Sequence, residues 1–176
     1  MKSQKFVIMG VSGSGKSTIG ALLAESIEGA FYDGDDFHPP ANIEKMASGR
    51  PLNDEDRKGW LEKIAELIET ADEVTIIACS ALKKSYRDLL RKADFIYLDG
   101  SRELIESRLR ERKGHYMPPS LLASQFSDLE VPENALVLDI DHPPEELVSE
   151  ICVHFGLMSG ESSNHHSHDS ASGQSR

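Results

Sequence analysis

The sequence predicts an α/β domain in which helices cover both faces of a parallel sheet. Short apolar segments alternate along the chain with segments of helical periodicity, the pattern of repeated strand–helix–strand units. Residues 74–79 form a continuous apolar run, which is typical of a strand buried on both faces. The chain has 176 residues, of which 39% are hydrophobic, so its length and composition suit one packed domain.

Each expected element rests on a local pattern. Residues 5–9 are short and apolar, and residues 16–27 follow with Ile19, Leu23 and Ile27 on one helical face. A second short strand is expected at 30–32, then helices at 40–47 and 54–70, the latter with Asn53 or Asp54 as N-cap. Beyond these, the pattern predicts strands at 74–79, 95–98 and 135–140 and helices at 82–91, 102–112, a short stretch ending near 125, and 145–155. Right-handed crossovers would connect the five strands.

The overall charge excludes some classes of partner. Nineteen Lys and Arg residues oppose 30 Asp and Glu residues, giving a formal net charge of −11. This charge argues against binding to nucleic acid or to an anionic membrane surface. No apolar run approaches the ~20 residues of a membrane span, and the apolar start is too short for a signal peptide. The two cysteines, Cys79 and Cys152, favour a reducing, cytoplasmic location.

The composition divides the chain into a folded body at 1–158 and a tail at 159–176. The tail consists mainly of Ser, Gly, His and Asn and lacks large apolar side chains, so we expect it to be disordered. His165, His166 and His168 are a weak candidate for binding a transition metal, and a solvated tail is the simpler interpretation.

The strongest functional signal is a phosphate-binding loop. Residues 10–17, GVSGSGKS, match G-x-x-x-x-G-K-[ST] between an expected strand and an expected helix, a context that a chance glycine turn would rarely share. Lys16 would reach the β- and γ-phosphates, and the Ser17 hydroxyl would ligate Mg²⁺. The guanine motif N-K-x-D is absent from the sequence, so adenine nucleotide is expected. The candidate nucleotide-binding residues are Gly10, Val11, Ser12, Gly13, Ser14, Gly15, Lys16, Ser17 and Thr18.

An acidic cluster, DGDDFHP at residues 33–39, follows the second expected strand. If the chain stays extended there, Asp33 and Asp35 face the same way, toward the edge where ligands bind in open α/β sheets. The strand at 74–79 ends without an aspartate, so Asp33 is the best carboxylate to assist a metal. Asp35 would then orient a hydroxyl and accept its proton. The alternative is an Asp-rich turn that caps the helix at 40–47.

Basic residues gather at one strand end of this acidic chain. Lys83 and Arg87 lie one helical turn apart after the strand at 74–79 and are expected to face an anionic ligand together. Arg57 is a further candidate, although a helix ion pair with Asp54 or Asp56 would also explain it. Weaker candidates are Lys45, Arg50 and Lys84.

A second basic stretch is typical of a lid at about 108–128. Arg108 and Arg112 are four residues apart near the end of a helix, and Gly114 is a suitable terminator. The segment continues through a Pro-Pro turn to Gln125. Arginines in such a segment close over phosphates and exclude water. An exposed charged helix is the alternative interpretation.

Joined together, these segments resemble the gluconokinase family of small-molecule kinases with a phosphate-binding loop. The resemblance spans about residues 6–155, and the blocks at 42–61 and 80–91 are far more specific than the loop alone. The matching segments are GVSGSGKST from Gly10, DGDDFHP from Asp33, NIEKMASGRPLNDEDRKGWL from Asn42, CSALKKSYRDLLR from Cys79, FIYLDG from Phe95, ESRLRERKGHYMP from Glu106, LLASQFSDLEVP from Leu121 and VLDID from Val137.

The resemblance implies a three-layer fold like that of nucleoside monophosphate kinases, with strand order 2-3-1-4-5, a substrate-side helical segment at about 37–70 and the lid. It implies phosphorylation of D-gluconate on its 6-hydroxyl with ATP and Mg²⁺, giving 6-phospho-D-gluconate for the pentose phosphate or Entner–Doudoroff route. The implied catalytic residues are Lys16, Asp35 and Arg112; the metal residues are Ser17 and Asp33; the substrate residues are Asp33, Asp35, His38, Arg57, Lys83, Arg87 and Gln125; and Arg108 and Asp139 join the nucleotide site.

Two alternatives stay open at this point. A shikimate-kinase-like enzyme would also use an Asp-x-Asp after its second strand and a basic pocket for an acid. A non-catalytic nucleotide-binding module would bind ATP without turnover, and Asp35 and the lid arginines argue against it. Gly59 stands where the family pattern has proline, which weakens the expected start of the helix at 54–70. The resemblance also makes a homodimer plausible.

Overall fold

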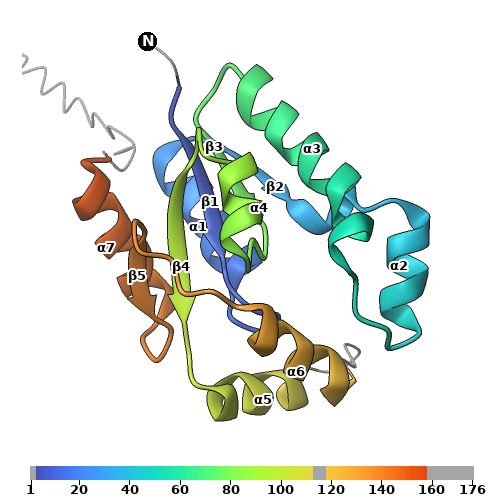
Figure 1. Cartoon of the computed structure of the whole chain (residues 1–176). Helices are drawn as coiled ribbons and strands as arrows, with labels where there is room; N and C mark the ends of the chain where they lie inside the picture. Colours follow the sequence, from blue (N-terminus) through green and yellow to red (C-terminus); the bar gives the residue numbers. More distant parts are fainter. Residues whose placement is uncertain (1–2, 113–117, 158–176) are drawn as a thin grey trace, which may run out of the picture.

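A five-stranded parallel sheet forms the centre of the molecule (Figure 1). The computed structural model describes residues 3–112 and 118–157, so the expected tail and residues 113–117 of the expected lid, Gly114 among them, lie outside the described residues. The strand order is β2-β3-β1-β4-β5, which confirms the predicted topology. The strands are β1 (Lys5–Met9), β2 (Ala30–Asp33), β3 (Thr75–Ala78), β4 (Asp94–Asp99) and β5 (Leu136–Asp139).

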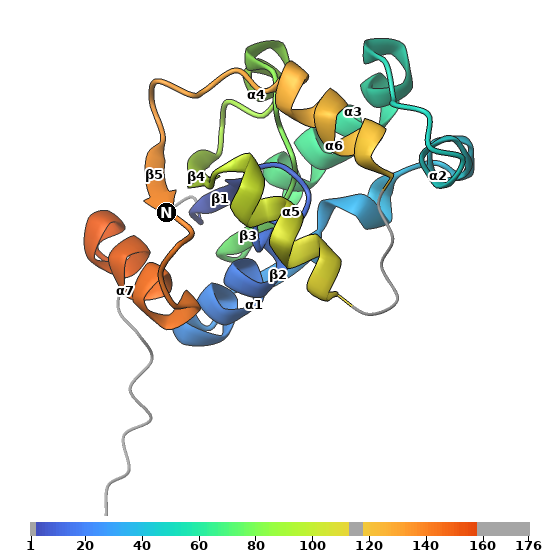
Figure 2. The same ribbon diagram turned by 90° about the horizontal axis from the view of Figure 1, so that it is seen from below.

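Helices cover both faces of the sheet and extend beyond its carboxyl edge. On one face, α1 (Lys16–Ile27) and α7 (Pro144–Phe155) lie side by side, with α3 (Asp54–Thr70) and α4 (Lys84–Leu89) on the other (Figure 2). Figure 1 shows α5 (Arg102–Glu111) and α6 (Pro119–Asp128) past the strand ends, and α2 (Pro40–Ala47) beside the start of α3. The carboxyl edge of the sheet, where the candidate site residues were expected, is therefore surrounded by α1, α2, α5 and α6.

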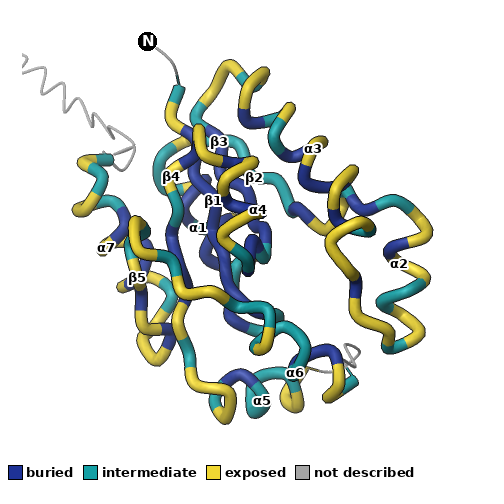
Figure 3. Tube along the Cα trace, in the orientation of Figure 1, coloured by how far each residue is buried: buried dark blue, intermediate teal, exposed yellow. Residues whose placement is uncertain are grey.

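The core divides into two layers because side chains alternate along each strand. Phe6 and Ile8 of β1 pack in the layer under α1 and α7, whereas Val7 and Met9 pack under α3 and α4. All four side chains are fully buried, as Figure 3 shows for the central strands. No helix within the described ranges is both long enough and apolar enough to cross a membrane.

Three segments near the carboxyl edge of the sheet differ from the sequence prediction. The helix expected at 82–91 runs only from Lys84 to Leu89, because Ala81 has a left-handed backbone (φ 43°) and Lys83 is the N-cap. Residues 34–37, expected to be extended, form a 3₁₀ turn instead. The helix after the Pro-Pro turn also continues to Asp128, beyond its expected end near residue 125. The first two differences change where candidate side chains point, namely Lys83 and Arg87 at α4 and Asp33 and Asp35 at the turn.

The start of α3 does not depend on residue 59. Asn53 caps the helix by accepting from the Asp56 N–H at 2.8 Å, and the Asp56 side chain accepts from the Asn53 N–H at 2.9 Å. This reciprocal capping box holds the first turn, and Gly59 lies in the second turn. The doubt that Gly59 raised about the helix start is therefore removed.

Gly59→Ala is expected to stabilise the protein by about 0.5–1 kcal/mol, because alanine is the better helix former and restricts the unfolded chain. Gly59 is exposed, and a Cβ there would meet nothing within 4 Å. Urea unfolding of both proteins measures the difference. Gly156→Ala is the matched control: its Cβ also has open space, but φ is +65° at the end of α7, so we expect destabilisation. Equal effects of the two substitutions would contradict this explanation.

Candidate active site

Two hollows flank the phosphate-binding loop at the carboxyl edge of the sheet. The smaller pocket, about 300 Å³, lies between the loop, α5 and the segment after β5. The larger one, about 660 Å³ and called the cleft from here on, lies between the loop, α2, α3 and α6. The smaller pocket includes Gly13, Ser14, Gly15, Thr18, Arg108, Arg112, Ile140 and His142. The cleft includes Ser12, Lys16, Asp35, His38, Arg57, Trp60 and Gln125.

The phosphate-binding loop is built to receive an anion at the start of α1. Gly15, the N-cap, has φ +97°, a left-handed conformation that glycine adopts without strain. The helix has no side-chain cap and no acidic residue in its first turn. Its first N–H groups and the positive end of its dipole therefore remain available to phosphate.

Lys16 lines the cleft, directly after Gly15, which lines the smaller pocket. Its ammonium donates to the carbonyls of Gly10 and Val11, both at 3.0 Å, which folds the side chain back along the loop. Burial lowers the pKa of Lys16 below its ordinary value, and the nearby Asp35 opposes the shift. An ammonium has three protons, so one remains for a ligand after these two contacts.

Asp33 and Asp35 reach the site through a turn. Asp33 accepts the N–H of Asp35 at 3.0 Å and so caps the 3₁₀ turn, while its other oxygen accepts from the Ser17 hydroxyl at 3.3 Å. The extended geometry predicted from alternation is therefore wrong, and Asp33 does act as a turn cap. The two carboxylates nonetheless serve different places, since Asp33 faces Ser17 and Asp35 lines the cleft.

Gly34 fixes this turn against the sheet. A Cβ at residue 34 would lie 2.4 Å from the carbonyl oxygen of Ala78, so only glycine allows the approach. The indole N–H of Trp60 donates to the Gly34 carbonyl at 2.7 Å, which joins the turn to α3. Two buried contacts thus fix Gly34, and through it the start of the turn that carries Asp35.

Asp35 and His38 face each other across the cleft floor. The Asp35 Oδ1 and His38 Nε2 atoms are 3.9 Å apart. Reduced hydration raises the pKa of Asp35, Lys16 opposes the shift, and Asp33 adds to it. Removal from water and the nearby Arg57 guanidinium lower the pKa of His38 from 6.5 to about 4. His38 is therefore a neutral ring at physiological pH.

The neutral His38 predicts an acid-dependent loss of stability. The pKa of His38 is 6.5 in the unfolded chain and about 4 in the folded chain, so below pH 6.5 the unfolded chain binds a proton that the folded chain does not. The free energy of unfolding is therefore unaffected by His38 above pH 6.5 and decreases as the pH falls toward 4. At pH 5 the loss is about 2 kcal/mol. The free energy of unfolding is measured with urea at pH 7 and pH 5. Its decrease between these pH values should be about 2 kcal/mol larger in the wild type than in His38→Gln, whose side chain cannot titrate. Equal losses in the two proteins would contradict the assignment.

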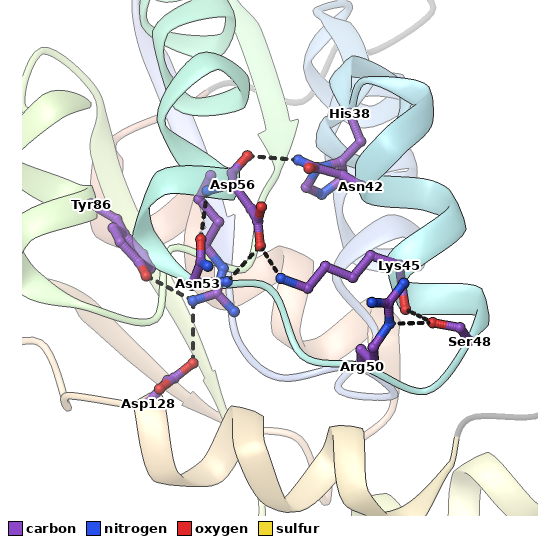
Figure 4. Close-up of polar contacts among 10 residues, drawn as sticks. His38, Asn42, Lys45, Ser48, Arg50, Asn53, Asp56, Tyr86 and Asp128 are labelled. Atoms are coloured by element: carbon purple, nitrogen blue, oxygen red, sulfur yellow. Dashed lines mark hydrogen bonds and ion pairs between the residues drawn. The ribbon is translucent and has the colours of Figure 1, made fainter.

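A polar network joins Arg57 to α6 and to α4. Arg57 donates from Nη1 to the Tyr86 hydroxyl at 2.7 Å and to Asp128 Oδ2 at 3.2 Å. The Tyr86 hydroxyl donates to Asp54, which also accepts from Lys83 at 3.0 Å. Figure 4 shows Tyr86 and Asp128 converging from two different elements. Arg57 is therefore held by residues outside its own helix, and the ion pair with Asp54 or Asp56 weighed from the sequence is not what positions it.

Arg87 does not point into the cleft, contrary to the sequence prediction. Its guanidinium donates to the carbonyls of Ala81 at 2.8 Å, Leu82 at 3.0 Å and Glu130 at 2.9 Å. It is buried and ties the start of α4 to the segment after α6. Lys83 points instead to Asp54, because Lys83 precedes the helix rather than lying within it. The two cations therefore do not share a face.

Helix α6 contacts the phosphate-binding loop directly through Gln125. Gln125 accepts the Ser12 N–H at 2.7 Å and donates to the Ser12 hydroxyl at 3.0 Å. Arg108 donates to the Ile140 carbonyl at 2.5 Å, and Arg112 lines the smaller pocket at the end of α5. Asp139 does not line that pocket: its carboxylate accepts the Asp141 N–H at 2.9 Å and so caps a turn.

Sequence reasoning missed three residues of this edge: Asn42, Tyr86 and Asp128. Asn42 is buried and contacts His38, and its spacing four residues after His38 was the available signal. Tyr86 and Asp128 stand within the segments that carry the family resemblance, yet their contact with Arg57 joins positions 29 and 71 residues apart. Figure 4 also shows Lys45 bonded to Asp56 and Arg50 to Ser48, so these two weaker candidates support α2 and its following loop.

Comparison with known proteins agrees with this geometry. The sequence profile of the shikimate kinase family matches residues 12–149. The thermoresistant gluconokinase of Escherichia coli K12 is 50% identical over 155 residues, covering 82% of this chain and 89% of that protein. The gluconokinase of Gluconobacter oxydans is 41% identical over 165 residues, covering 88% and 93%.

Solved structures give the same result. A gluconokinase from Sinorhizobium meliloti superposes with a TM-score of 0.81 at 41% identity, covering 87% of this chain and 91% of that one. Shikimate kinase from Aquifex aeolicus, at 20% identity and a TM-score of 0.59, shares the fold. The chain shares half of its aligned residues with one gluconokinase, and its backbone superposes on that of another. The chain therefore belongs to the gluconokinase family of P-loop kinases.

Proposed function

We propose that this enzyme transfers the γ-phosphoryl group of ATP to the 6-hydroxyl of D-gluconate, giving 6-phospho-D-gluconate and ADP. The observation that carries the proposal is the cleft, in which Lys16 of the phosphate-binding loop, Asp35 and Arg57 line one hollow. A sugar acid needs a cation for its carboxylate and acceptors for its hydroxyls, and the cleft offers both. The choice of D-gluconate among sugar acids follows the names of the relatives, which are gluconokinases at 41–50% identity.

The nucleotide would bind with its phosphates on the loop and its base in the smaller pocket. The first turn of α1 and Lys16 meet the phosphates, and Arg108 and Arg112 approach from α5. The Ser14 hydroxyl is the one buried side-chain polar atom without a partner among the residues that the structure describes, and a phosphate oxygen would satisfy it. Ile140 and His142, rather than Asp139, would lie beside the adenine.

Ser17 and Asp33 would hold Mg²⁺. Their oxygens already lie 3.3 Å apart, and both are ligand types that magnesium prefers. Within the described residues no three His, Cys, Asp or Glu side chains form a metal cluster, which suits a cation that takes most of its ligands from phosphates and water. When bound, Mg²⁺ neutralises charge on the β- and γ-phosphates.

Gluconate would occupy the cleft with its carboxylate at Arg57 and its reactive end at Asp35. Arg57 uses Nη1 for Tyr86 and Asp128, so the rest of its guanidinium can meet the substrate carboxylate. Gln125 lines the cleft and would contact the substrate from α6. Lys83 does not line the cleft, but its ammonium and the Arg57 guanidinium both lie over the Tyr86 ring, so Lys83 would add positive charge behind Arg57. Arg87 is withdrawn from this list because carbonyl oxygens occupy its guanidinium.

In the transfer step, the 6-hydroxyl oxygen forms a bond to the γ-phosphorus. The bond from that phosphorus to the β–γ bridging oxygen breaks, and ADP leaves with its electron pair. Asp35 accepts the hydroxyl proton, while Lys16 and Arg112 stabilise the charge on the moving group.

A substrate panel tests the proposal. ADP release is coupled to a spectrophotometric assay with D-gluconate, shikimate or a nucleoside monophosphate as acceptor. Of the three acceptors, we expect only D-gluconate to be turned over, and we expect NMR of the product to show the phosphate at the 6-position. Turnover with shikimate would support the runner-up enzyme class, and ATP binding without any turnover would support a non-catalytic module.

Location and assembly also remain part of the proposal. Cys79 is buried, and burial raises its pKa to about 12, so its thiol is unreactive; Cys152 is a second free thiol. Two unpaired cysteines suit a reducing, cytoplasmic environment. A homodimer, suggested by the family resemblance, would be detected by sedimentation velocity.

A further inference from the structure

Asn42 occupies a buried position where its amide can lie in only one orientation. Its side chain lies between His38 and the start of α3 (Figure 4). The Asn42 Nδ2 atom is 2.8 Å from the backbone carbonyl oxygen of Asp56 and 3.2 Å from His38 Nδ1. A carbonyl oxygen only accepts hydrogen bonds, so the amide NH₂ must face Asp56. The second hydrogen of that NH₂ then faces His38.

This orientation fixes the protonation of the His38 ring. A neutral imidazole has one donor and one acceptor nitrogen, and Nδ1 must accept from Asn42, so Nε2 carries the proton. The ring cannot rotate away, because it stacks on Trp60 with centroids 4.2 Å apart and planes 16° apart. Burial and the positive charge of Arg57 keep it neutral. His38 therefore presents a fixed N–H toward the cleft.

His38 Nε2 and Asp35 Oδ1 lie close enough for one hydroxyl oxygen to contact both of them. The 3.9 Å between His38 Nε2 and Asp35 Oδ1 is too long for a direct hydrogen bond. One oxygen atom can lie about 2.8 Å from both atoms if it bridges them from one side, about 2 Å off the line that joins them. Such an oxygen must accept from His38 and donate to Asp35, and a hydroxyl group does both.

We propose that Asn42 locks His38 as the Nε2–H tautomer, and that His38 donates this hydrogen bond to the oxygen of the hydroxyl whose proton Asp35 accepts. The proposal rests on the proposed function, because Asp35 defines which hydroxyl reacts. His38 is then a catalytic residue that positions the nucleophilic oxygen, and Asn42 is a positioning residue that acts through His38. The lock also prevents His38 from serving as the base, since Nε2 already holds its proton.

The tautomer is measured directly, without substrate, by ¹⁵N NMR of the imidazole rings in the labelled full chain. His38 is assigned by the signal that disappears in His38→Gln. We expect an unmixed Nε2–H pattern between pH 7 and pH 5. In Asn42→Asp, a carboxylate faces Nδ1 and should move the proton to Nδ1 or protonate the ring. Asn53→Asp is the matched control, since aspartate also caps helices and Asn53 does not touch His38. An Nδ1–H pattern in the wild type would overturn the lock.

Turnover tests the donor role. The amide nitrogen of Gln at position 38 can take the place of Nε2, whereas that of Asn reaches only the place of Nδ1. We expect His38→Gln to retain most of kcat, and His38→Asn, His38→Leu and Asn42→Asp to lose about tenfold, the worth of one hydrogen bond, with little change in KM for gluconate. Asn53→Asp should keep wild-type kcat.

The outcomes separate this proposal from the proposed function. If the wild type turns over gluconate and His38→Leu keeps full kcat, the donor role is overturned while the function stands. If the wild type does not turn over gluconate, the proposed function fails and the donor role fails with it. A tenfold loss in His38→Leu and Asn42→Asp, with His38→Gln active and the tautomer shifted only in Asn42→Asp, supports both parts of the proposal.

Discussion

Lys16→Ala should reduce kcat by ~10²–10³-fold in a protein that still folds. Lys16 lines the cleft beside the phosphate-binding loop, and its ammonium has a proton free for the phosphoryl group. Charge on that group is redistributed during transfer, so a fixed cation there stabilises the transition state more than the ground state. The measurement is kcat with saturating ATP and gluconate, beside a urea unfolding curve.

The fold should tolerate this substitution because Lys16 bonds only to carbonyls of its own loop. The two hydrogen bonds to Gly10 and Val11 are lost, but the cost of burying the ammonium, which lowers the pKa of Lys16, is removed with them, so the net loss of stability should be small. Lys84→Ala is the control, since Lys84 is exposed, pairs with Asp88 on its own helix and lines neither hollow. Wild-type turnover in a folded Lys16→Ala protein would remove the loop from the mechanism.

The elements that the sequence predicted well are those decided by local patterns. The bounds of α3 match the expected 54–70 because Asn53 and Asp56 form a capping box within four residues of each other. The strand β3 at Thr75–Ala78 lies within the expected 74–79 because this run is buried throughout and has no side that faces water, whereas the strand order was implied by the family resemblance. In both cases the residues that fix the element lie inside it or next to it.

The site depends on contacts that no local pattern contains. Arg87 turns from the cleft because the Glu130 carbonyl, 43 residues away, completes its set of acceptors. Asp33 bends the chain at 34–37 because its side chain accepts a backbone N–H two residues on, in competition with an extended backbone. Helical spacing therefore grouped Lys83 with Arg87, although tertiary contacts separate them.

Asp35→Asn should lower kcat by ~10²–10⁴-fold with a modest change in gluconate affinity. The amide keeps the size of the side chain and can still hydrogen-bond the attacking hydroxyl, but it is a very poor proton acceptor. The turn should keep its shape, because the Asp33 cap and the bond from Trp60 to Gly34 do not involve the Asp35 carboxylate. Single-turnover kinetics and gluconate titration measure the two quantities separately.

Two neighbouring substitutions make this test specific. Asp36→Asn is the same chemical change one residue later, outside both hollows, and should leave kcat unchanged. Asp33→Asn removes a carboxylate bonded to Ser17, so its defect should be partly relieved by raising Mg²⁺, whereas that of Asp35→Asn should not. If both mutants respond alike to Mg²⁺, the division of roles between Asp33 and Asp35 is wrong. If Asp35→Asn turns over normally, Asp35 has a role only in the turn, and another group must accept the hydroxyl proton. His38 can be that group only if its Nε2 atom carries no proton, and the ¹⁵N spectra of the wild type would reveal this.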